Sequence, residues 1–472
     1  MISDRFRWVF CQLDTLRRCL ASSIRKALDE LPTTLDDTYE RALQEIPKEK
    51  WRHAHRLFQC LVAAIRPLSV DELAEIFSIK FDADRSATGG LMEGWRPENA
   101  EEALLSACST LIAIVENEGS KIVQFSHFSV KEYLTSDRLE TSSVGSICNY
   151  HIRLDGAHTI LAQACLSVLL QLDENVDEER LGTFPLAFYA AEHWVKHAKF
   201  EDVTLRIQED MERLFDPRKP YLAAWVWIYD VYWGCVRRPL AKHPSPLNGT
   251  ALYYASLYGF SGLAKYIICT HGEDVNADSG YHGTPLRAAS IKGHIDVVRV
   301  LLDHGANVNT IDKRNTPLRS AYVGGHLEIM RLLLEHGADV DAWDYSDLLL
   351  NSASKKGRAE VVHLLLQHNA DVNSRGYTNW TALQGASFFG RTKVVRILLD
   401  HGVDIDTLSR AIEHPLHIAT RNNRLEIVQL LLERGADVTI RDGDDRTPYH
   451  VAELYGRTEI ARLLLEHGTE KE

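Results

Sequence analysis

Hydrophobic and polar residues in the second half of the chain follow one recurring pattern. Short apolar stretches end at a small residue, and these turn positions are Gly259, Gly293, Gly325, Gly357, Gly390, Asn423 and Gly456, at intervals of 34, 32, 32, 33, 33 and 33 residues. A second apolar run follows each turn in phase, for example LLDHGANVN at 301–309 and LLLEHGADVD at 332–341. A fixed period of this length indicates a repeat architecture instead of one globular core.

Each landmark of the repeat predicts a local structure. Thr284, Thr316 and Thr447 precede short apolar runs, so we expect their hydroxyls to cap helices, with Pro317 or Pro448 at the first helical position. The turn glycine permits a positive φ before a second, longer helix. That second helix ends at a His-Gly pair such as 304–305, where glycine adopts the left-handed conformation. The recurrence of His304, His336, His401 and His467 with the repeat predicts a structural role for them.

The fourth repeat departs from this pattern. It reads DLLLNSASKKG at 347–357, without the Thr-Pro-Leu sequence of its neighbours, and its His-Gly pair is replaced by His368-Asn369. Loss of a good N-cap typically costs about 1 kcal/mol. We therefore expect faster amide hydrogen exchange over 347–370 than in the second and third repeats.

The first half of the chain has a different pattern, in which apolar residues recur at helical spacing over separate segments. These segments are RCLASSIRKALDELP (18–32), TTLDDTYERALQEIP (33–47), WRHAHRLFQCLVAAI (51–65), SVDELAEIFSI (69–79) and PENAEEALLSACS (97–109). Two extended runs, TLIAIVEN and KIVQFS, follow with a turn between them. Helices followed by a hairpin are the element order of a winged helix. The predicted fold is mostly α: a helical and winged-helix N-terminal half followed by an α-solenoid of about seven repeats.

Both halves resemble known families. The repeat landmarks closely resemble ankyrin repeats over 247–472. The segments LDTLRRC (13–19), LPTTLDDTYERAL (31–43), RPLSVDELAEI (66–76), FSHFSVKEYLTS (125–136) and FPLAFYAAEHWVKHA (184–198) resemble the region between the nucleotide-binding domain and the repeats of fungal NACHT-ankyrin proteins. Part of that region is named the GPI inositol-deacylase winged-helix domain.

The resemblance implies four domains. We expect a helical remnant of a NACHT module at 1–46, a winged-helix-like domain at 47–142, a helical linker or cap domain at 143–246, and ankyrin repeats at 247–472. In the family, an NTPase domain precedes this region and the whole protein transduces a signal.

The sequence departs from that family in its chemistry. It contains no Gly-x-x-x-x-Gly-Lys-Ser/Thr loop to hold nucleotide phosphates and no Gly-x-Ser-x-Gly elbow for an acyl hydrolase. We therefore expect no enzymatic activity, no cofactor and no metal. The alternative is that this chain is a fragment of a STAND-type signalling NTPase whose nucleotide-binding domain is missing, in which case Met1 is not the true start.

Charge and cysteine usage indicate which partners are unfavourable and which cellular compartment fits the chain. The net charge is −13, from 53 basic and 66 acidic residues, and both halves share the acidic excess. An acidic chain is a poor partner for nucleic acids or anionic membranes. The eight cysteines lie far apart, without Cys-x-x-Cys pairs, and no signal peptide precedes them. We expect reduced thiols and a cytoplasmic location, with the nucleus as the alternative.

The winged helix raises the question of DNA binding. Its expected recognition helix, PENAEEALLSACS, carries Glu98, Glu101 and Glu102 with no basic residue inside it. Phosphate contacts require the opposite charge, so this element is expected to be a packing spacer between domains. His127 lies at a strand-to-helix corner, where capping is a better explanation than catalysis.

Partner binding is predicted on the concave face of the repeats, at the two residues before each turn. The candidate residues there are Leu257, Tyr258, Ile291, Lys292, Val323, Lys355, Lys356, Phe388, Phe389, Leu454 and Tyr455, and Trp343, Tyr345, Tyr377 and Trp380 add aromatic side chains at the hairpin tips. Exposed apolar residues in a row are typical of a partner surface. The alternative is that side chains of adjacent repeats cover one another. Lys355 and Lys356 either favour an acidic partner or solvate the fourth repeat.

These observations predict a non-catalytic scaffold, adaptor or regulator that binds a protein partner, with a transcription co-regulator as one version of that role. No small-molecule substrate, no membrane and no direct nucleic-acid contact are expected.

Overall fold

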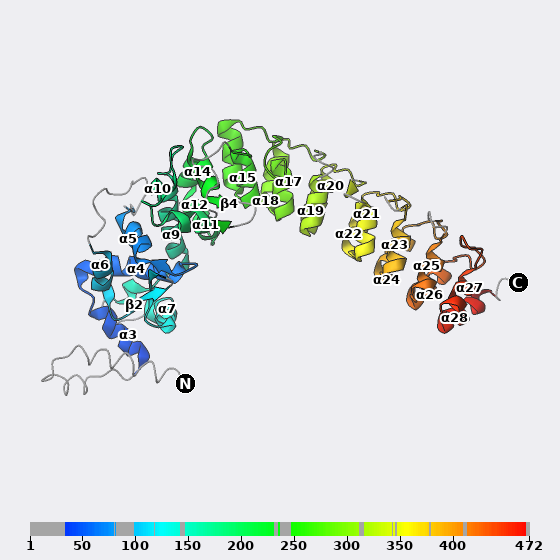
Figure 1. The fold of residues 1–472 in the computed structure, drawn as a ribbon, viewed down its shortest axis with the longest axis horizontal. Coiled ribbons are helices and arrows are strands. Elements are labelled where there is room, and N and C mark those ends of the chain that lie inside the picture. Colours follow the sequence, from blue (N-terminus) through cyan, green and yellow to red (C-terminus); the bar gives the residue numbers. More distant parts are fainter. Residues whose placement is uncertain are drawn as a thin grey trace. The chain divides into compact units, whose positions relative to one another are not determined.

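The computed structural model describes residues 34–79, 81, 99–117, 119–141, 147–230, 235–236, 247–310, 316–341, 343–344, 347–376, 379–408 and 413–468. The chain divides into two compact units, Met1–Leu247 and Asn248–Glu472 (Figure 1). The motif LDTLRRC and the first expected helix, at 18–32, lie outside the described residues.

The N-terminal unit contains the winged helix that the sequence predicted. Helix α3 (Leu35–Gln44) precedes the domain expected at 47–142. That domain contains a 3-10 turn (Lys48–Lys50), α4 (Trp51–Ala63), β1 (Leu68–Ser69), α5 (Val70–Ser78), α6 (Ala100–Cys108), β2 (Ile112–Asn117), β3 (Ser120–Phe125) and α7 (Phe128–Leu134). The strands form an antiparallel sheet in the order β1-β3-β2. In its register Val123 of β3 pairs with Leu68 on one side and Ile114 on the other. Leu68 and Val123 are both buried, so the sheet packs one face against the helices.

Two capping boxes set the helix starts in this unit. Thr34 and Asp37 form one at the start of α3, and Ser69 and Glu72 form one at the start of α5. Glu72 is buried and its carboxylate also accepts two hydrogen bonds from Arg66. This pairing compensates the cost of burying the charge.

The rest of the N-terminal unit is a helical layer. It contains α8 (Asp137–Glu140), a 3-10 turn (Ile147–Tyr150), α9 (Leu154–Leu169), α10 (Glu178–Leu181), α11 (Ala187–Ala198), α12 (Val203–Arg206), α13 (Gln208–Leu214), α14 (Tyr221–Ile228), and a short pair of strands, β4 (Tyr229–Asp230) and β5 (Cys235–Val236). Helices α9 and α11 pack closely. The rings of Trp194 and Trp225 meet edge to face at 5.2 Å in a fully buried core, and the Trp225 indole donates to the Ala191 carbonyl at 2.9 Å.

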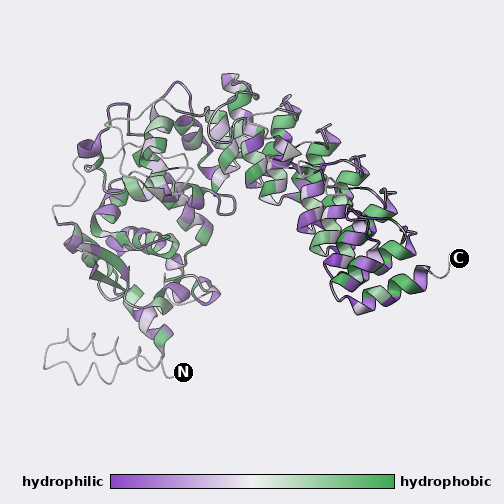
Figure 2. Ribbon diagram, turned by 45° about the vertical axis from the view of Figure 1, so that its right-hand side comes forward, coloured by the Kyte–Doolittle hydropathy of each residue, from purple (hydrophilic) through white to green (hydrophobic). Residues whose placement is uncertain are grey.

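The C-terminal unit is a row of helix pairs (Figure 1). The pairs are α15 (Ala251–Tyr258) with α16 (Ser261–Tyr266), α17 (Pro285–Lys292) with α18 (Ile295–Asp303), α19 (Pro317–Gly324) with α20 (Leu327–Glu335), α21 (Leu349–Lys356) with α22 (Ala359–Gln367), α23 (Ala382–Phe389) with α24 (Thr392–Asp400), α25 (Pro415–Arg421) with α26 (Leu425–Glu433), and α27 (Pro448–Leu454) with α28 (Thr458–Gly468). A π-helical turn (Ile267–His271) extends α16, and two short strands, β6 (Trp343–Asp344) and β7 (Asp347–Leu348), precede α21. Hydrophobic and hydrophilic residues alternate along these helices in Figure 2, as expected for elements that bury one side against neighbours.

The local signals of the repeat are confirmed. The hydroxyls of Thr284, Thr316 and Thr447 accept hydrogen bonds from the third residue after them. The turn glycines, such as Gly293 with φ 84°, adopt the left-handed conformation. In the fourth repeat the N-cap is Leu348, whose side chain makes no capping hydrogen bond.

The junction between the third and fourth repeats differs from the others. First helices of neighbouring repeats pack closely at α15–α17, α17–α19, α21–α23, α23–α25 and α25–α27, whereas α19 and α21 approach less closely. On the side of the second helices, a groove of about 380 Å³ separates α20 from α22, with Leu327, Arg331 and His363 among its lining residues. On the side of the first helices, the buried ring of Tyr322 occupies the junction.

Candidate partner-binding surface

The residues just before the turns form the candidate surface, and most of the described apolar ones are exposed. The exposed fractions are 50% for Val323, 37% for Phe388, 44% for Phe389, 61% for Leu454 and 45% for Tyr455. Lys292 and Lys356 are also exposed, and Tyr258 and Ile291 are partly exposed. A folded chain gains by burying large apolar side chains, so their recurrence in solvent at one repeat position needs an explanation.

An aromatic cluster lies on this surface in the fifth repeat. The rings of Phe388 and Phe389, at the end of α23, meet edge to face at 4.9 Å. Trp380, from the loop before the same helix, lies 5.3 Å from Phe388 between ring centroids. Rings that pack on one another are held in place before any partner arrives, so binding would cost little side-chain entropy.

Leu257 does not belong to this surface. It is only 4% exposed, and the expectation that it faces solvent is wrong for this residue. The reason is the packing of α15, in which every residue from 251 to 257 is buried. A leucine at the end of a helix buried over that length remains in the core.

Lys355 is engaged within the fourth repeat. Its ammonium lies 2.6 Å from the carboxylate of Asp347, which is itself buried, and 6.0 Å from the ring centroid of Trp380. Lys356 points to the preceding repeat, with its ammonium 5.1 Å from the Tyr322 ring centroid. The sequence offered both lysines as possible contacts for an acidic partner. Lys355 does not fit this role, because it neutralises a buried carboxylate.

The hairpin-tip residues are described only in part. Trp380 is partly exposed. Trp343 belongs to β6, which pairs with β7, but its side chain lies outside the described residues, as do Tyr345 and Tyr377 altogether.

Sequence reasoning missed the residues that follow the turns of the second to seventh repeats. Their side chains bond to the backbone of the preceding repeat: the ring Nε2 of His294 and of His326 lies 3.1 and 3.2 Å from the carbonyl oxygens of Leu257 and Ile291. In later repeats arginine takes this position, and Arg358, Arg391, Arg424 and Arg457 donate to the carbonyls of Tyr322, Lys355, Phe388 and Arg421. These carbonyls lie at the ends of first helices, where intrahelical donors run out. A polar residue recurring directly after the turn glycine was the available signal.

Several histidines have the structural roles that the sequence predicted. The Nδ1 atoms of His304, His336, His401 and His467 lie 2.7, 2.8, 2.8 and 3.0 Å from the carbonyl oxygen four residues earlier. His127 is the N-cap of α7, and its Nδ1 accepts from the Ser129 amide at 3.0 Å. The hydroxyl of Ser129 lies 2.6 Å from the same nitrogen, so this histidine is engaged locally.

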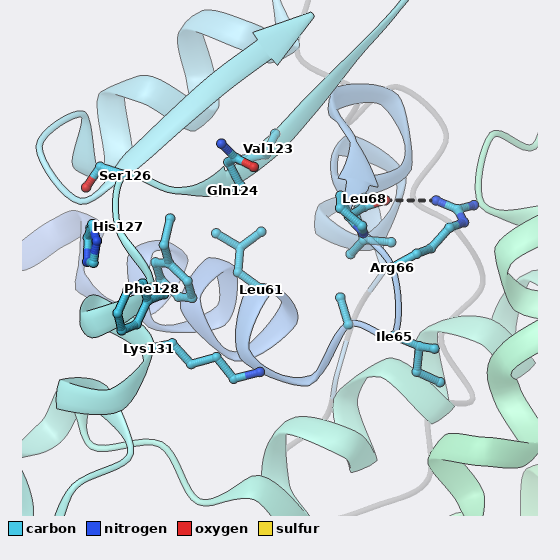
Figure 3. A pocket seen from close by; sticks show the side chains of 13 residues that line it. Leu61, Ile65, Arg66, Leu68, Val123, Gln124, Ser126, His127, Phe128 and Lys131 are labelled. Carbon is cyan, nitrogen blue, oxygen red and sulfur yellow. Dashed lines mark hydrogen bonds between the residues drawn. The ribbon is translucent and has the colours of Figure 1, made fainter. Parts of the chain in front are cut away.

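The winged helix also contains a groove. A groove of about 500 Å³ runs between the end of α4 and strand β3. In Figure 3, Leu61 and Phe128 lie near one another beside β3, while Arg66 stands at the opposite end and donates to the Pro67 carbonyl. Arg66 also binds Glu72, so one cation of the groove is neutralised from within the domain, whereas Lys131 lines the same groove as a second cation.

One acidic residue of helix α6 is paired within the domain. Glu101 of α6 pairs with Lys121 of β3 at 2.6 Å, which joins the helix to the hairpin. Within the described part of the chain, no helix is long and apolar enough to cross a bilayer, and no group of three or more metal-binding side chains could hold an ion.

The family models that match the chain agree with both units. Residues 252–344, 344–409 and 409–472 match ankyrin repeats, in three copies of the model. Residues 39–144 match the winged helix domain of GPI inositol-deacylase. The chain therefore carries a winged helix domain of this type followed by ankyrin repeats, the order that the sequence predicted. Ankyrin repeats support a role in protein interaction and are typically not catalytic.

One curated relative and several solved structures are similar. The azaphilone pigments biosynthesis cluster protein L of Monascus ruber is 34% identical over 297 residues, which are 60% of this chain and 61% of that protein. The chain thus spans about three fifths of that relative's length. The human ASB11 ankyrin repeat domain has 27% identity over 47% of this chain and 97% of its own, with a TM-score of 0.39. The corresponding values for the Bcl-3 ankyrin repeat domain are 25%, 46%, 99% and 0.43.

Proposed function

We propose that this chain is a non-catalytic interaction protein that binds a protein partner at the residues before the repeat turns. The observation that carries the proposal is the aromatic cluster of Trp380, Phe388 and Phe389, which is prearranged by ring contacts and has both phenylalanines exposed. Val323 and Leu454 extend the same row in other repeats. In this role the chain is an adaptor or regulator, and a DNA-bound protein is among the partners it could serve without touching DNA.

We also propose boundaries for the domains. We place the winged helix at 47–142 and the repeats at 247–472, with 143–246 as the helical layer between them. The repeats supply the docking surface, and the acidic α6 makes the winged helix a packing element and not a reader of phosphates.

Affinity capture with paired variants tests the proposal. Phe388→Ser/Phe389→Ser removes the exposed rings, whereas Leu425→Ser/Leu465→Ser removes two exposed leucines from the second helices α26 and α28. Partners are defined as the proteins that are captured and cross-linked by the wild type. We expect the leucine variant to capture them and the phenylalanine variant to lose them. The far-ultraviolet circular dichroism of both variants should equal that of the wild type. Retention of every partner by the phenylalanine variant would contradict the site.

A further inference from the structure

Basic residues gather at the turns of the last four repeats, although the chain as a whole is acidic. The turn segments 355–358, 388–391, 421–424 and 454–457 read KKGR, FFGR, RNNR and LYGR. Together they contain seven basic residues and no acidic one, in a chain with a net charge of −13. Like charges placed together in this way repel each other, so their concentration suggests a compensating partner.

Two of these cations already have partners. Lys355 binds Asp347, and Arg421 binds Glu413. No ion pair is described for the remaining five, which are Lys356, Arg358, Arg391, Arg424 and Arg457. Two carboxylates of the second helices are engaged or placed elsewhere. Glu426 accepts a hydrogen bond from the Thr392 hydroxyl at 3.1 Å, and Glu360 lines the groove on the second-helix side.

The arginines are held in position by the fold. Arg391 Nε donates to the Lys355 carbonyl at 3.1 Å, and Arg424 donates through Nε and Nη2 to the Phe388 carbonyl at 3.4 and 3.3 Å. A guanidinium has five N–H donors, so each of these arginines keeps donors for another acceptor. Because the carbonyl bonds already restrict the side chains, an incoming carboxylate would order them at little further cost in entropy.

Apolar side chains lie beside these cations. Phe388 and Phe389 precede Arg391 by three and two residues, and Leu454 and Tyr455 precede Arg457 by the same spacing. The Arg421 guanidinium lies 5.8 Å from the Tyr455 ring centroid. The exposed surface of these repeats therefore offers apolar and cationic contacts in alternation.

We propose that the fourth to seventh repeats bind an acidic segment of a protein partner that also carries apolar side chains. Its carboxylates contact Arg391, Arg424 and Arg457, and its apolar side chains contact the phenylalanine pair and the leucine-tyrosine pair. The inference rests on the proposed function and specifies the chemistry of the partner. A single-stranded nucleic acid could also use cations and rings, but the acidic chain around this surface disfavours a long polyanion.

A displayed library of random peptides, selected on the full chain, tests this chemistry. We expect enriched peptides to combine Asp or Glu with Leu or aromatic residues, and to bind more weakly at about 300 mM than at about 50 mM NaCl. Arg391→Gln/Arg424→Gln should reduce binding of those peptides by about tenfold or more. Arg299→Gln/Arg396→Gln, the same charge change on the second helices α18 and α24, should leave it within about twofold.

A charge-preserving variant separates binding from folding. Arg391→Lys/Arg424→Lys keeps both charges but alters the carbonyl contacts, so its peptide binding should exceed that of the glutamine variant. Equal loss in the two variants, enrichment of neutral or basic peptides, or no enrichment would each overturn the proposal. So would tighter binding of a labelled oligothymidylate than of the acidic peptides. If these outcomes occurred while the phenylalanine variant still lost its captured partners, only the acidic chemistry would fail and the proposed function would stand.

Discussion

The hydroxyl of Tyr322 lies 3.0 Å from the hydroxyl of Ser352 and thereby joins the third repeat to the fourth. Three residues before the turn, the first, second, fourth and fifth repeats have serine, as at Ser256 and Ser290, whereas the third has this tyrosine. Arg358 of the fourth repeat lies over the tyrosine ring at 4.5 Å and donates to its carbonyl at 2.7 Å. A large side chain thus fills the junction at which α19 and α21 are less closely packed.

Shortening Tyr322 should weaken this junction in two steps. Tyr322→Phe removes one hydrogen bond and should lower the free energy of unfolding by about 1 kcal/mol. Tyr322→Ser, which introduces the residue of the first, second, fourth and fifth repeats, should lower it by about 3 kcal/mol because it leaves a cavity. Urea unfolding of the full chain measures both. A loss below about 1 kcal/mol for the serine variant would mean that the repeats close the gap by themselves.

The fourth repeat should open more readily than the second and third repeats. Its first helix, α21, lacks a side-chain cap, whereas α17 and α19 are capped by Thr284 and Thr316. An uncapped helix start leaves amide donors without partners, which favours local opening. Native-state hydrogen exchange should therefore be faster over 347–370 than over the second and third repeats. Equal protection in all three would contradict this prediction.

Removing Lys355 should destabilise the fourth repeat. Lys355→Gln leaves the carboxylate of Asp347, whose side chain is only 7% exposed, without its cation. We expect a loss of about 1–3 kcal/mol, reduced from the value for a fully buried pair because the lysine is partly exposed. Lys292→Gln changes an exposed lysine before the turn of the second repeat and should stay within about 0.5 kcal/mol of wild type. Equal unfolding midpoints for the two variants would argue against the buried pair.

Asp210 should make the N-terminal unit less stable as the pH rises. The residue is fully buried in α13, its carboxylate oxygens have no hydrogen-bond partner among the described residues, and Arg213 Nη1 is 3.5 Å away. Burial raises the pKa of Asp210 from 3.8 to about 6. Between these two pKa values the folded state binds more protons than the unfolded state, so stability falls as pH rises through this window and stays lower above it.

Asp210→Asn should remove this pH dependence. At pH 8 the variant should be more stable than wild type by about 1–3 kcal/mol, and the difference should vanish below about pH 3, where the aspartate is protonated in both states. Glu179→Gln, an exposed change in α10 of the same unit, serves as the control. Calorimetric scans across this pH range measure the effect, and a variant less stable than wild type at pH 8 would show that the Arg213 contact outweighs burial.

The sequence alone was enough to predict the parts of this protein that depend on neighbouring residues. The threonine caps at 284, 316 and 447 and the glycine turns act within a few residues of themselves, so their periodic spacing predicted the repeats. The same holds for Ser69 and Glu72, which lie three residues apart and form the capping box at the start of α5. The exposed phenylalanines at 388 and 389 were predicted because their position in the repeat is known once its period is known.

Only the tertiary structure decided which residues from different repeats meet. The burial of Leu257, the contact of Tyr322 with Ser352, and the bond from Arg424 to the Phe388 carbonyl all depend on how neighbouring helices are spaced. Contacts across 30 or 36 residues depend on the shape and orientation of two surfaces at once, and a one-dimensional pattern does not contain that information. The repeat period therefore determined the row of helices, and side-chain packing between its members determined which positions remain available to a partner.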